Sequence, residues 1–186
     1  YLESHGINVR DNLKIASNAH IITELHKAQD GKDEKIGTTR TGNGPAYRDK
    51  YNRTGLRACD VPSLSPLLVD IYEELSGDTT ILMEGAQGFW LDPDWGDYPY
   101  VTSSHTGVAA AIQNGINHRS IRNVWGIVKA YETYVGKRAF QPDDPIFDKI
   151  QEAGGEFGAT TGRVRQCNWI NIEEVKKAIL MNGVNR

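Results

Sequence analysis

Apolar and polar positions along the chain repeat at two spacings, one helical and one strand-like. In SPLLVDIYEELSG, the residues Leu67, Leu68, Ile71 and Leu75 fall on one helical face. Short apolar runs such as ILM, and β-branched or aromatic runs such as VWGIVKAYETYV, are instead typical of strands. Helices are therefore predicted at 22–31, 45–55, 65–77, 107–116, 144–155 and 171–183, and strands within 13–22, at 81–83 and at 124–135.

Several predicted helices carry residues that favour a helix end. Pro45 suits a first helical position, and Gly31 and Gly55 suit helix C-caps. Asn171, with Glu174 three positions later, predicts a capping box. These residues mark the boundaries of the predicted helices.

Helices and strands alternate along the 186 residues, which fit one domain or most of a larger one. This alternation predicts an α/β fold with a largely parallel sheet flanked by helices. Ligands of such folds bind beyond the carboxyl ends of the strands. The glycine-containing loop 85–88, which follows the predicted strand at 81–83, is therefore a candidate binding position.

The composition favours a soluble protein that binds small molecules. The chain is 39% apolar and 24% charged, and its formal net charge of -3 gives no reason to expect nucleic-acid binding. Its 19 glycines cluster near 37–44, 85–88 and 154–162, where the backbone can approach a ligand closely. Loops are therefore expected to carry the function. Arginines that could form a local positive site are Arg53, Arg57, Arg163 and Arg165.

Cys59 and Cys167 lie far apart and form neither a CxxC pair nor a zinc-type spacing. Both are expected to be free thiols in a reducing compartment. No apolar run approaches the length of a membrane span, and the first ten residues lack the features of a signal peptide. A cytoplasmic protein without membrane contact is therefore expected.

The loop EFGATTGRVR gathers hydroxyl and guanidinium groups around glycines. If it is extended, Arg163 and Arg165 project from the same side and Val164 points the other way as an anchor. Two guanidiniums can hold a carboxylate or a phosphate, and the hydroxyls of Thr160 and Thr161 can complete the site. The alternative is a solvated loop with two surface arginines.

The loop GTTRTGNGP repeats this chemistry with Thr38, Thr39 and Thr41, and Arg53 lies on the helix that follows. Phosphate would suit these groups, although the P-loop motif GxxxxGK[ST] occurs nowhere in the chain. The alternative is a plain turn.

Gln87 lies in the loop after the predicted strand at 81–83, and Thr102 follows an aromatic segment. A side-chain amide both donates and accepts, so Gln87 can read a purine edge, or it can simply cap the backbone. Asp92 and Asp94 are interpreted as turn formers rather than metal ligands, and His105 as a hydrogen-bonded bystander. No metal ligand is predicted in this chain.

Four segments in this order closely resemble the central part of the adenylosuccinate synthetase family: IGTTRTGNGPAYRDKYNRTGLRACDV, MEGAQGFWLDPDWGDYPYVTSSHT, GIVKAYETYVG and EFGATTGRVRQCNWI. The resemblance implies a P-loop-NTPase-like ligase fold, with 1–186 as the central part of a single domain. It also implies an enzyme of purine nucleotide biosynthesis, which uses GTP or ATP and Mg²⁺ to join L-aspartate to C6 of a 6-oxopurine nucleotide, as from IMP to adenylosuccinate. The family phosphorylates the purine O6 first, and the aspartate amine then displaces phosphate.

The resemblance also implies roles for single residues. Gln87 matches the glutamine that reads the purine near O6, and it is therefore the catalytic residue expected in this chain. Arg53 matches an arginine that reaches the nucleotide of the neighbouring subunit, which implies a homodimer. Nucleotide contacts are expected at Thr38, Thr39, Arg53, Gln87, Thr102, Val135 and Arg163, and aspartate contacts at Thr160, Thr161, Arg163 and Arg165.

The chain departs from the family pattern in several ways. The family's phosphate loop with its catalytic aspartate, and its catalytic histidine, are expected before residue 1, and its guanine-selecting segment after 186. The Mg²⁺ ligands are expected outside this chain, so this chain alone is expected to be inactive. The region between GLRACDV and ILMEGAQG is shorter than in bacterial enzymes. Arg40, Thr41 and Asn43, together with TYVGKRAFQPD, differ around the nucleotide site, as in phage members that join aspartate to dGMP. IMP or dGMP as substrate, and a non-catalytic nucleotide-binding or dimerisation module, remain alternatives.

Overall fold

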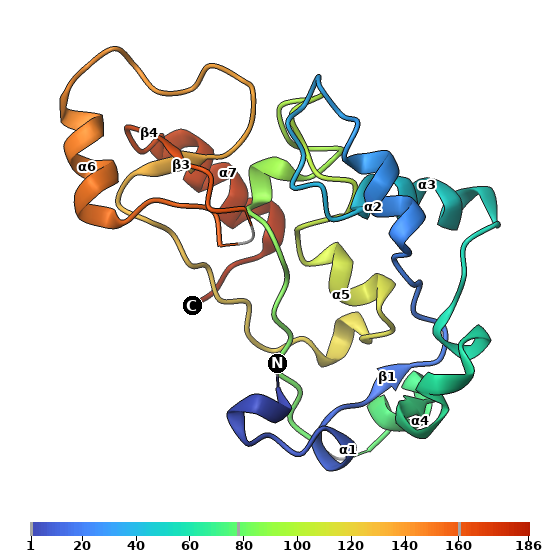
Figure 1. Ribbon diagram of the computed structural model, residues 1–186. Helices are drawn as coiled ribbons and strands as arrows, with labels where there is room; N and C mark the ends of the chain where they lie inside the picture. Colours follow the sequence, from blue (N-terminus) through green and yellow to red (C-terminus); the bar gives the residue numbers. More distant parts are fainter. Residues whose placement is uncertain (1, 78, 160) are drawn as a thin grey trace.

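The computed structural model describes residues 2–77, 79–159 and 161–186 (Figure 1). Helices and strands alternate along the chain, as predicted. The helices are α1 Val9–Asn12, α2 Glu24–Asp30, α3 Asn43–Asn52, α4 Ile71–Leu75, α5 Ala109–Gln113, α6 Ile146–Gly154 and α7 Ile172–Asn182. The strands are β1 Ile15–Ala16, β2 Leu68–Val69, β3 Glu132–Tyr134 and β4 Gln166–Asn168. Short 3₁₀ turns at Glu3–His5, Ala58–Asp60, Pro62–Leu67, Phe89–Leu91 and His118–Ser120 connect them.

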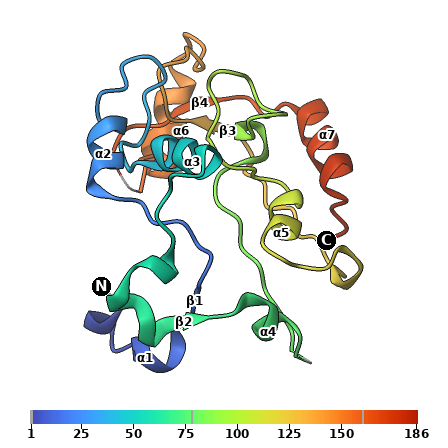
Figure 2. The same cartoon turned by 90° about the vertical axis from the view of Figure 1, so that its right-hand side faces the viewer.

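The described strands form two pairs. β1 and β2 are parallel, with Ile15 opposite Leu68, and β3 and β4 are antiparallel, with Thr133 opposite Cys167. Figure 2 shows β1, β2, α1 and α4 together at the lower end of the molecule, and β3, β4 and α6 in the upper part with α2 and α3. The upper part carries the candidate site.

The helix predicted at 65–77 is wrong over its first half. Pro66 lies in a 3₁₀ turn, and Leu68–Val69 forms strand β2 instead of a helical face. Asp70 then starts α4, because its side chain accepts a hydrogen bond from the backbone N–H of Tyr72. Pairing with β1 and the cap at Asp70 therefore outweigh the helical spacing of the apolar residues.

The strands predicted at 81–83 and over the first part of 124–135 are also wrong. Leu82 is 91% exposed and Ile127 is 93% exposed, and β3 covers only Glu132–Tyr134. A strand needs a partner for its backbone groups, and among the described residues neither segment pairs with another strand. The apolar spacing therefore identified segments that form no strand here, although the backbone of Val124 and Gly126 bonds to residues 185–186.

The predicted helix at 45–55 is present but begins earlier. α3 starts at Asn43 after Gly42, so Pro45 is the third helical residue and not the first. The helix ends at Asn52, where Arg53 takes the left-handed conformation predicted for Gly55. Gly42 has φ +88°, and a Cβ there would lie 2.8 Å from Ile22 Cγ2, so only glycine lets α3 begin this close to α2.

Helices α2 and α3 are joined by a buried histidine. His26 Nδ1 accepts the backbone N–H of Thr23 at 3.1 Å, so this nitrogen carries no proton. His26 Nε2 therefore donates to Asp49 Oδ2 at 3.1 Å on α3. The predicted α2 is confirmed, and this contact sets where α3 packs against it.

Helices α6 and α7 are confirmed close to their predicted positions. Asn171 accepts the backbone N–H groups of Glu173 and Glu174, as a helix N-cap does. In the predicted capping box, the Glu174 side chain would accept the backbone N–H of Asn171. That N–H donates instead to the side chain of Glu132 on β3. This contact ties the start of α7 to the β3–β4 pair.

Large side chains are fully buried where α6 packs against the β3–β4 pair. Phe147 of α6 and Cys167 of β4 are fully buried, and Tyr134 of β3 is 7% exposed. Phe147 meets Trp169 edge to face at 5.0 Å between ring centroids. These contacts fix the hairpin that precedes β4, which carries Arg163 and Arg165.

Candidate active site

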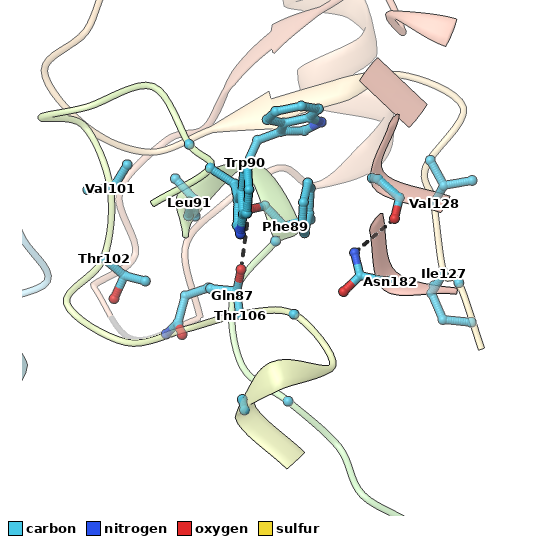
Figure 3. A pocket seen from close by; sticks show the side chains of 18 of the residues that line it. Gln87, Phe89, Trp90, Leu91, Val101, Thr102, Thr106, Ile127, Val128 and Asn182 are labelled. Atoms are coloured by element: carbon cyan, nitrogen blue, oxygen red, sulfur yellow. Dashed lines mark hydrogen bonds between the residues drawn. The ribbon is translucent and has the colours of Figure 1, made fainter. Parts of the chain in front are cut away.

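A large open cavity of about 2720 Å³ is lined by residues of α5, α7, the β3–β4 pair and the loops around them. Its volume exceeds the roughly 300–1,000 Å³ of a pocket for one small ligand, so it has room for more than one. Figure 3 shows Gln87 and Thr102 on its wall, with Ile127 and Val128 across the view. The residues predicted as contacts that line it are Thr38, Thr39, Gln87, Thr102, Val135, Arg163 and Arg165.

Two predicted contacts are placed elsewhere, and a third lies outside the described residues. Arg53 caps α3, is exposed and does not line the cavity. Thr161 also lies off the cavity wall, and its hydroxyl accepts the backbone N–H of Arg163 at 3.3 Å. Thr160 lies outside the described residues. The hydroxyl of Thr161 therefore supports the loop backbone in this conformation.

Two aspartates shape the threonine loop, which we define as residues 36–42. Asp33 accepts the backbone N–H groups of Ile36, Gly37 and Thr38, the shortest at 2.7 Å from Gly37. Burial alone would raise the pKa of Asp33, but these hydrogen bonds outweigh it and hold the pKa below its usual range. The carboxylate of buried Asp30 accepts the N–H of Gly42 at 2.8 Å. Two acidic side chains thus hold the backbone of the loop, and Asp30 itself lines the cavity.

Arg163 joins the two loops that were predicted separately. Its Nη1 donates to the carbonyl of Gly37 at 2.8 Å and its Nη2 donates to the carbonyl of Thr38 at 3.1 Å. These bonds span 126 and 125 positions of sequence. The guanidinium therefore sets the distance between the threonine loop and the arginine hairpin, which we define as residues 156–165.

Arg165 has a different partner, the buried carboxylate of Glu156. Its Nη1 donates to Glu156 Oε2 at 2.7 Å, and Glu156 is 3% exposed. Lys129 and Tyr131 donate to the other oxygen, Oε1, at 2.7 and 2.6 Å. Both arginines line the cavity, but neither is a free clamp here, because each already holds a protein group.

The prediction that Val164 anchors the hairpin is wrong. Val164 is 52% exposed and forms a single bridge with Phe157, which is itself 52% exposed. The hairpin is held instead by backbone bonds, such as Gly158 N–H to the carbonyl of Arg163 at 2.7 Å, and by Glu156. A polar network therefore fixes this segment where an apolar anchor was expected.

Gln87 is one of three non-glycine residues with positive φ among the described residues, at +66°. This conformation is unusual for a residue with a side chain and costs of order 1 kcal/mol or more. The exposed side chain lies on the cavity wall near Thr102 (Figure 3). Such strain is often retained at functional positions.

Asp92, Asp94 and His105 place their ligand atoms within 4.8 Å of one another, so they could hold a metal ion. Asp92 is 2% exposed and accepts the backbone N–H groups of Asp94 and Thr106 at 3.0 and 2.9 Å. His105 Nδ1 lies 3.3 Å from Asp92 Oδ2. Burial alone would raise the pKa of Asp92, but these bonds lower it. The hydrogen bonds of Asp92 support the backbone of this loop. The absence of a metal ligand in this chain stays a prediction.

The family model for adenylosuccinate synthetase matches residues 1–67 and 62–186. The chain belongs to the adenylosuccinate synthetase family. The two matched stretches meet at 62–67, where the sequence predicted a region shorter than in bacterial enzymes.

Relatives and solved structures agree with this membership. The adenylosuccinate synthetase of Caldicellulosiruptor bescii is 35% identical over 100% of this chain and 56% of its own length. That of Caldanaerobacter subterraneus is 37% identical over 98% of the chain and 56% of its length. The chain thus spans about half the length of these relatives.

The structure of a fully ligated adenylosuccinate synthetase from Plasmodium falciparum superposes with a TM-score of 0.91 and 29% identity, over 98% of this chain and 56% of the other. This match confirms the predicted α/β class. A cyanophage S-2L succinoaminodeoxyadenylate synthetase, bound to dGMP and dATP, has a TM-score of 0.76 at 24% identity over 93% of this chain and 56% of its own, which shows a shared fold.

Several residues that shape this synthetase-family site were missed from the sequence. Asp33 precedes Gly37 at a spacing at which an aspartate can accept loop N–H groups, and this signal was present. Lys129 and Tyr131 are two apart, so period-two spacing places them on one side of an extended segment. Nothing in the sequence signals that both meet Glu156, because that contact is made across the fold.

Proposed function

We propose that the full protein ligates L-aspartate to C6 of a 6-oxopurine nucleotide in the cytoplasm, with a nucleoside triphosphate as phosphoryl donor. The observation that carries the proposal is that residues from four distant segments, all matching family contacts, line one cavity. Family membership gives the reaction class, a C–N ligase of purine nucleotide biosynthesis. Residues 1–186 are proposed to be the central part of its single domain.

The chemistry needs groups that hold several anions close together. Thr38, Thr39 and Thr102 are proposed to receive the nucleotide phosphate, and Val135 to contact the ribose. Gln87 is proposed to read the purine beside O6, where its amide can donate to the oxygen and so favour phosphoryl transfer. Once O6 is phosphorylated it becomes a leaving group, and the aspartate amine displaces it as phosphate.

The arginine hairpin is proposed to hold aspartate. Arg163 and Arg165 would each bind a carboxylate through charge-assisted bonds, supported by the hydroxyls of Thr160 and Thr161. Arg163 also contacts the threonine loop, so it is proposed to act at both substrates. Arg53, which is exposed at the end of α3, is proposed to reach the nucleotide bound to a second subunit.

The described residues do not fit the Mg²⁺ that the family uses. Mg²⁺ prefers octahedral oxygen ligands, whereas the candidate group offers one histidine, and its buried carboxylate already accepts two backbone N–H groups. We assign no step of the reaction to a metal held by this chain.

The test is an assay of the full-length protein with aspartate and Mg²⁺, in which IMP or dGMP is combined with GTP or ATP. Mass spectrometry would detect the succinylated nucleotide. Product from IMP is expected, whereas product from dGMP alone would move the substrate to the phage type. No product from any combination, with nucleotide binding intact, would favour a non-catalytic module.

A further inference from the structure

Glu156 is a buried charge for which the proposed reaction has no use. It is 3% exposed, and three side chains donate to it at 2.6 to 2.7 Å. Burial by itself would raise its pKa, but the hydrogen bonds from Lys129, Tyr131 and Arg165 outweigh burial and lower the pKa of Glu156 to about 2. The carboxylate is therefore ionised near neutral pH.

The two oxygens of Glu156 have different partners. Oε1 accepts from Lys129 and Tyr131, which belong to the extended segment before β3. Oε2 accepts from Nη1 of Arg165, which leads into β4. The Lys129 ammonium also lies 5.6 Å from the centre of the Tyr131 ring. One oxygen is thus fixed by the β3 side of the site, and the other holds the arginine.

The backbone reinforces this arrangement. The N–H of Arg165 donates to the carbonyl of Glu156 at 2.9 Å, and the N–H of Glu156 donates to the carbonyl of Gln151 in α6 at 3.0 Å. Both ends of the Glu156–Arg165 contact are therefore held by main chain as well as by side chain. An arginine fixed in this way loses little rotamer freedom when it binds a ligand.

The contact uses only part of the guanidinium. An arginine has five N–H donors, and Nη1 to Glu156 is the one side-chain bond of Arg165 among the described residues. The side chain remains 30% exposed and lines the cavity. Glu156 therefore leaves donors of Arg165 available on the cavity side.

The charge of Glu156 is a second reason why it holds Arg165 in place. Lys129 and Arg165 both lie within 2.7 Å of its oxygens, so without the carboxylate two cations would face each other near the cavity. Without Glu156 to hold it, the Arg165 guanidinium would be turned away from its present position by this repulsion.

We propose that Glu156 is a positioning residue, which holds the Arg165 guanidinium towards the cavity so that its remaining donors bind a carboxylate of the dicarboxylate substrate. Lys129 and Tyr131 hold Glu156 in turn. The inference rests on the proposed function, because it takes aspartate as the ligand of the hairpin.

The test is steady-state kinetics of the full-length protein and its Glu156→Gln variant, which keeps the volume of the side chain and removes its charge. The aspartate KM is expected to rise about tenfold or more, the size expected when a charge-assisted bond is lost, and the nucleotide KM to stay within twofold. Glu156→Asp should recover part of the loss. Glu24→Gln, which breaks an exposed ion pair with Lys27 away from the cavity wall, is the matched control and should change neither KM.

A double variant separates positioning from general damage. In an Arg165→Leu protein, the further change Glu156→Gln should leave the aspartate KM unchanged, because no guanidinium is left to position. An additive rise, or an equal rise in both KM values for Glu156→Gln alone, would overturn the proposal.

Two further outcomes are informative. If Glu156→Gln does not fold, Tyr131→Phe removes one bond to Glu156 Oε1, and a smaller rise in the aspartate KM alone supports positioning, whereas no rise opposes it. An unaltered protein without ligase activity would remove the proposed function. Aspartate binding measured by calorimetry would then still show whether Glu156 positions Arg165.

Discussion

Three non-glycine residues hold a left-handed backbone among the described residues: Arg40, Arg53 and Gln87. Each conformation costs roughly 1–2 kcal/mol relative to the right-handed form. Arg53 and Gln87 are proposed nucleotide contacts, and Arg40 directly follows the proposed contact Thr39 in the threonine loop. At the scale of single residues, backbone strain thus coincides with the candidate site, as expected where function outweighs stability.

Arg53→Gly should stabilise the fold and weaken nucleotide binding. Glycine relieves the left-handed conformation at φ +64°, so the free energy of unfolding should rise by up to about 1 kcal/mol in chemical denaturation. The nucleotide KM should rise because the guanidinium is lost. Arg53→Ala, which removes the same side chain without relieving the backbone, is the control. An alanine variant as stable as the glycine variant would contradict this account of the strain.

Arg163→Leu should affect both substrates. The aspartate KM should rise and kcat should fall, because charge-assisted bonds of roughly 1.5 to 3 kcal/mol each are lost. The nucleotide KM should also rise, since Arg163 holds the carbonyls of Gly37 and Thr38. Arg165→Leu is the comparison, and it should raise the aspartate KM alone. Steady-state kinetics in which Arg163→Leu leaves the aspartate KM unchanged would argue against the hairpin as the aspartate site.

At the scale of elements, helix ends were predicted better than strands. Capping acts over three or four neighbouring residues, so Asn171 could be identified from local sequence, and it does cap α7. Strand pairing acts across the fold, so Leu68–Val69 became a strand although it reads as helix, and Leu82 remained exposed although it reads as strand. α7 in turn supports α5, because Asn182 accepts the backbone N–H of Val108 at 2.9 Å.

Asn171→Ala should destabilise the protein by about 1 kcal/mol, because the N–H groups of Glu173 and Glu174 lose their acceptor at the start of α7. Asn171→Ser should recover most of that loss, because serine is also a good N-cap. Chemical denaturation of the three proteins measures the difference. Equal stability of the alanine and serine variants would show that the cap contributes little.

At the scale of the whole molecule, polar contacts between distant segments assemble the cavity. Arg163 contacts Gly37, which lies 126 positions away in the sequence, and Lys129 contacts Glu156, which lies 27 positions away. Lys137 adds to this, since its backbone N–H donates to the carbonyl of Ile36 at 3.2 Å and its ammonium donates to the carbonyl of Glu34. No helix in the described ranges is long and apolar enough to cross a membrane.

Stability should fall in acid because of these networks. The pKa of Glu156 is lowered from 4.5 to about 2 by its three donors, so its stabilisation is complete above about pH 4.5 and is lost as the pH falls towards 2. The full difference corresponds to about 3 kcal/mol. Denaturation at pH 7, 5 and 3 should show a decline that is smaller in Glu156→Gln. An equal decline in both proteins would assign the acid sensitivity to other groups.

The sequence by itself determined the family, the α/β class, the helices at α2, α6 and α7, and the residue types of the site. These depend on local spacing, on capping and on motifs in a set order. Only the tertiary structure decided that Arg163 holds the threonine loop, that Glu156 holds Arg165, and which apolar segments find a strand partner. Each of these contacts joins segments that no short-range pattern connects. It stabilises the protein only once the chain has folded and brought those segments together.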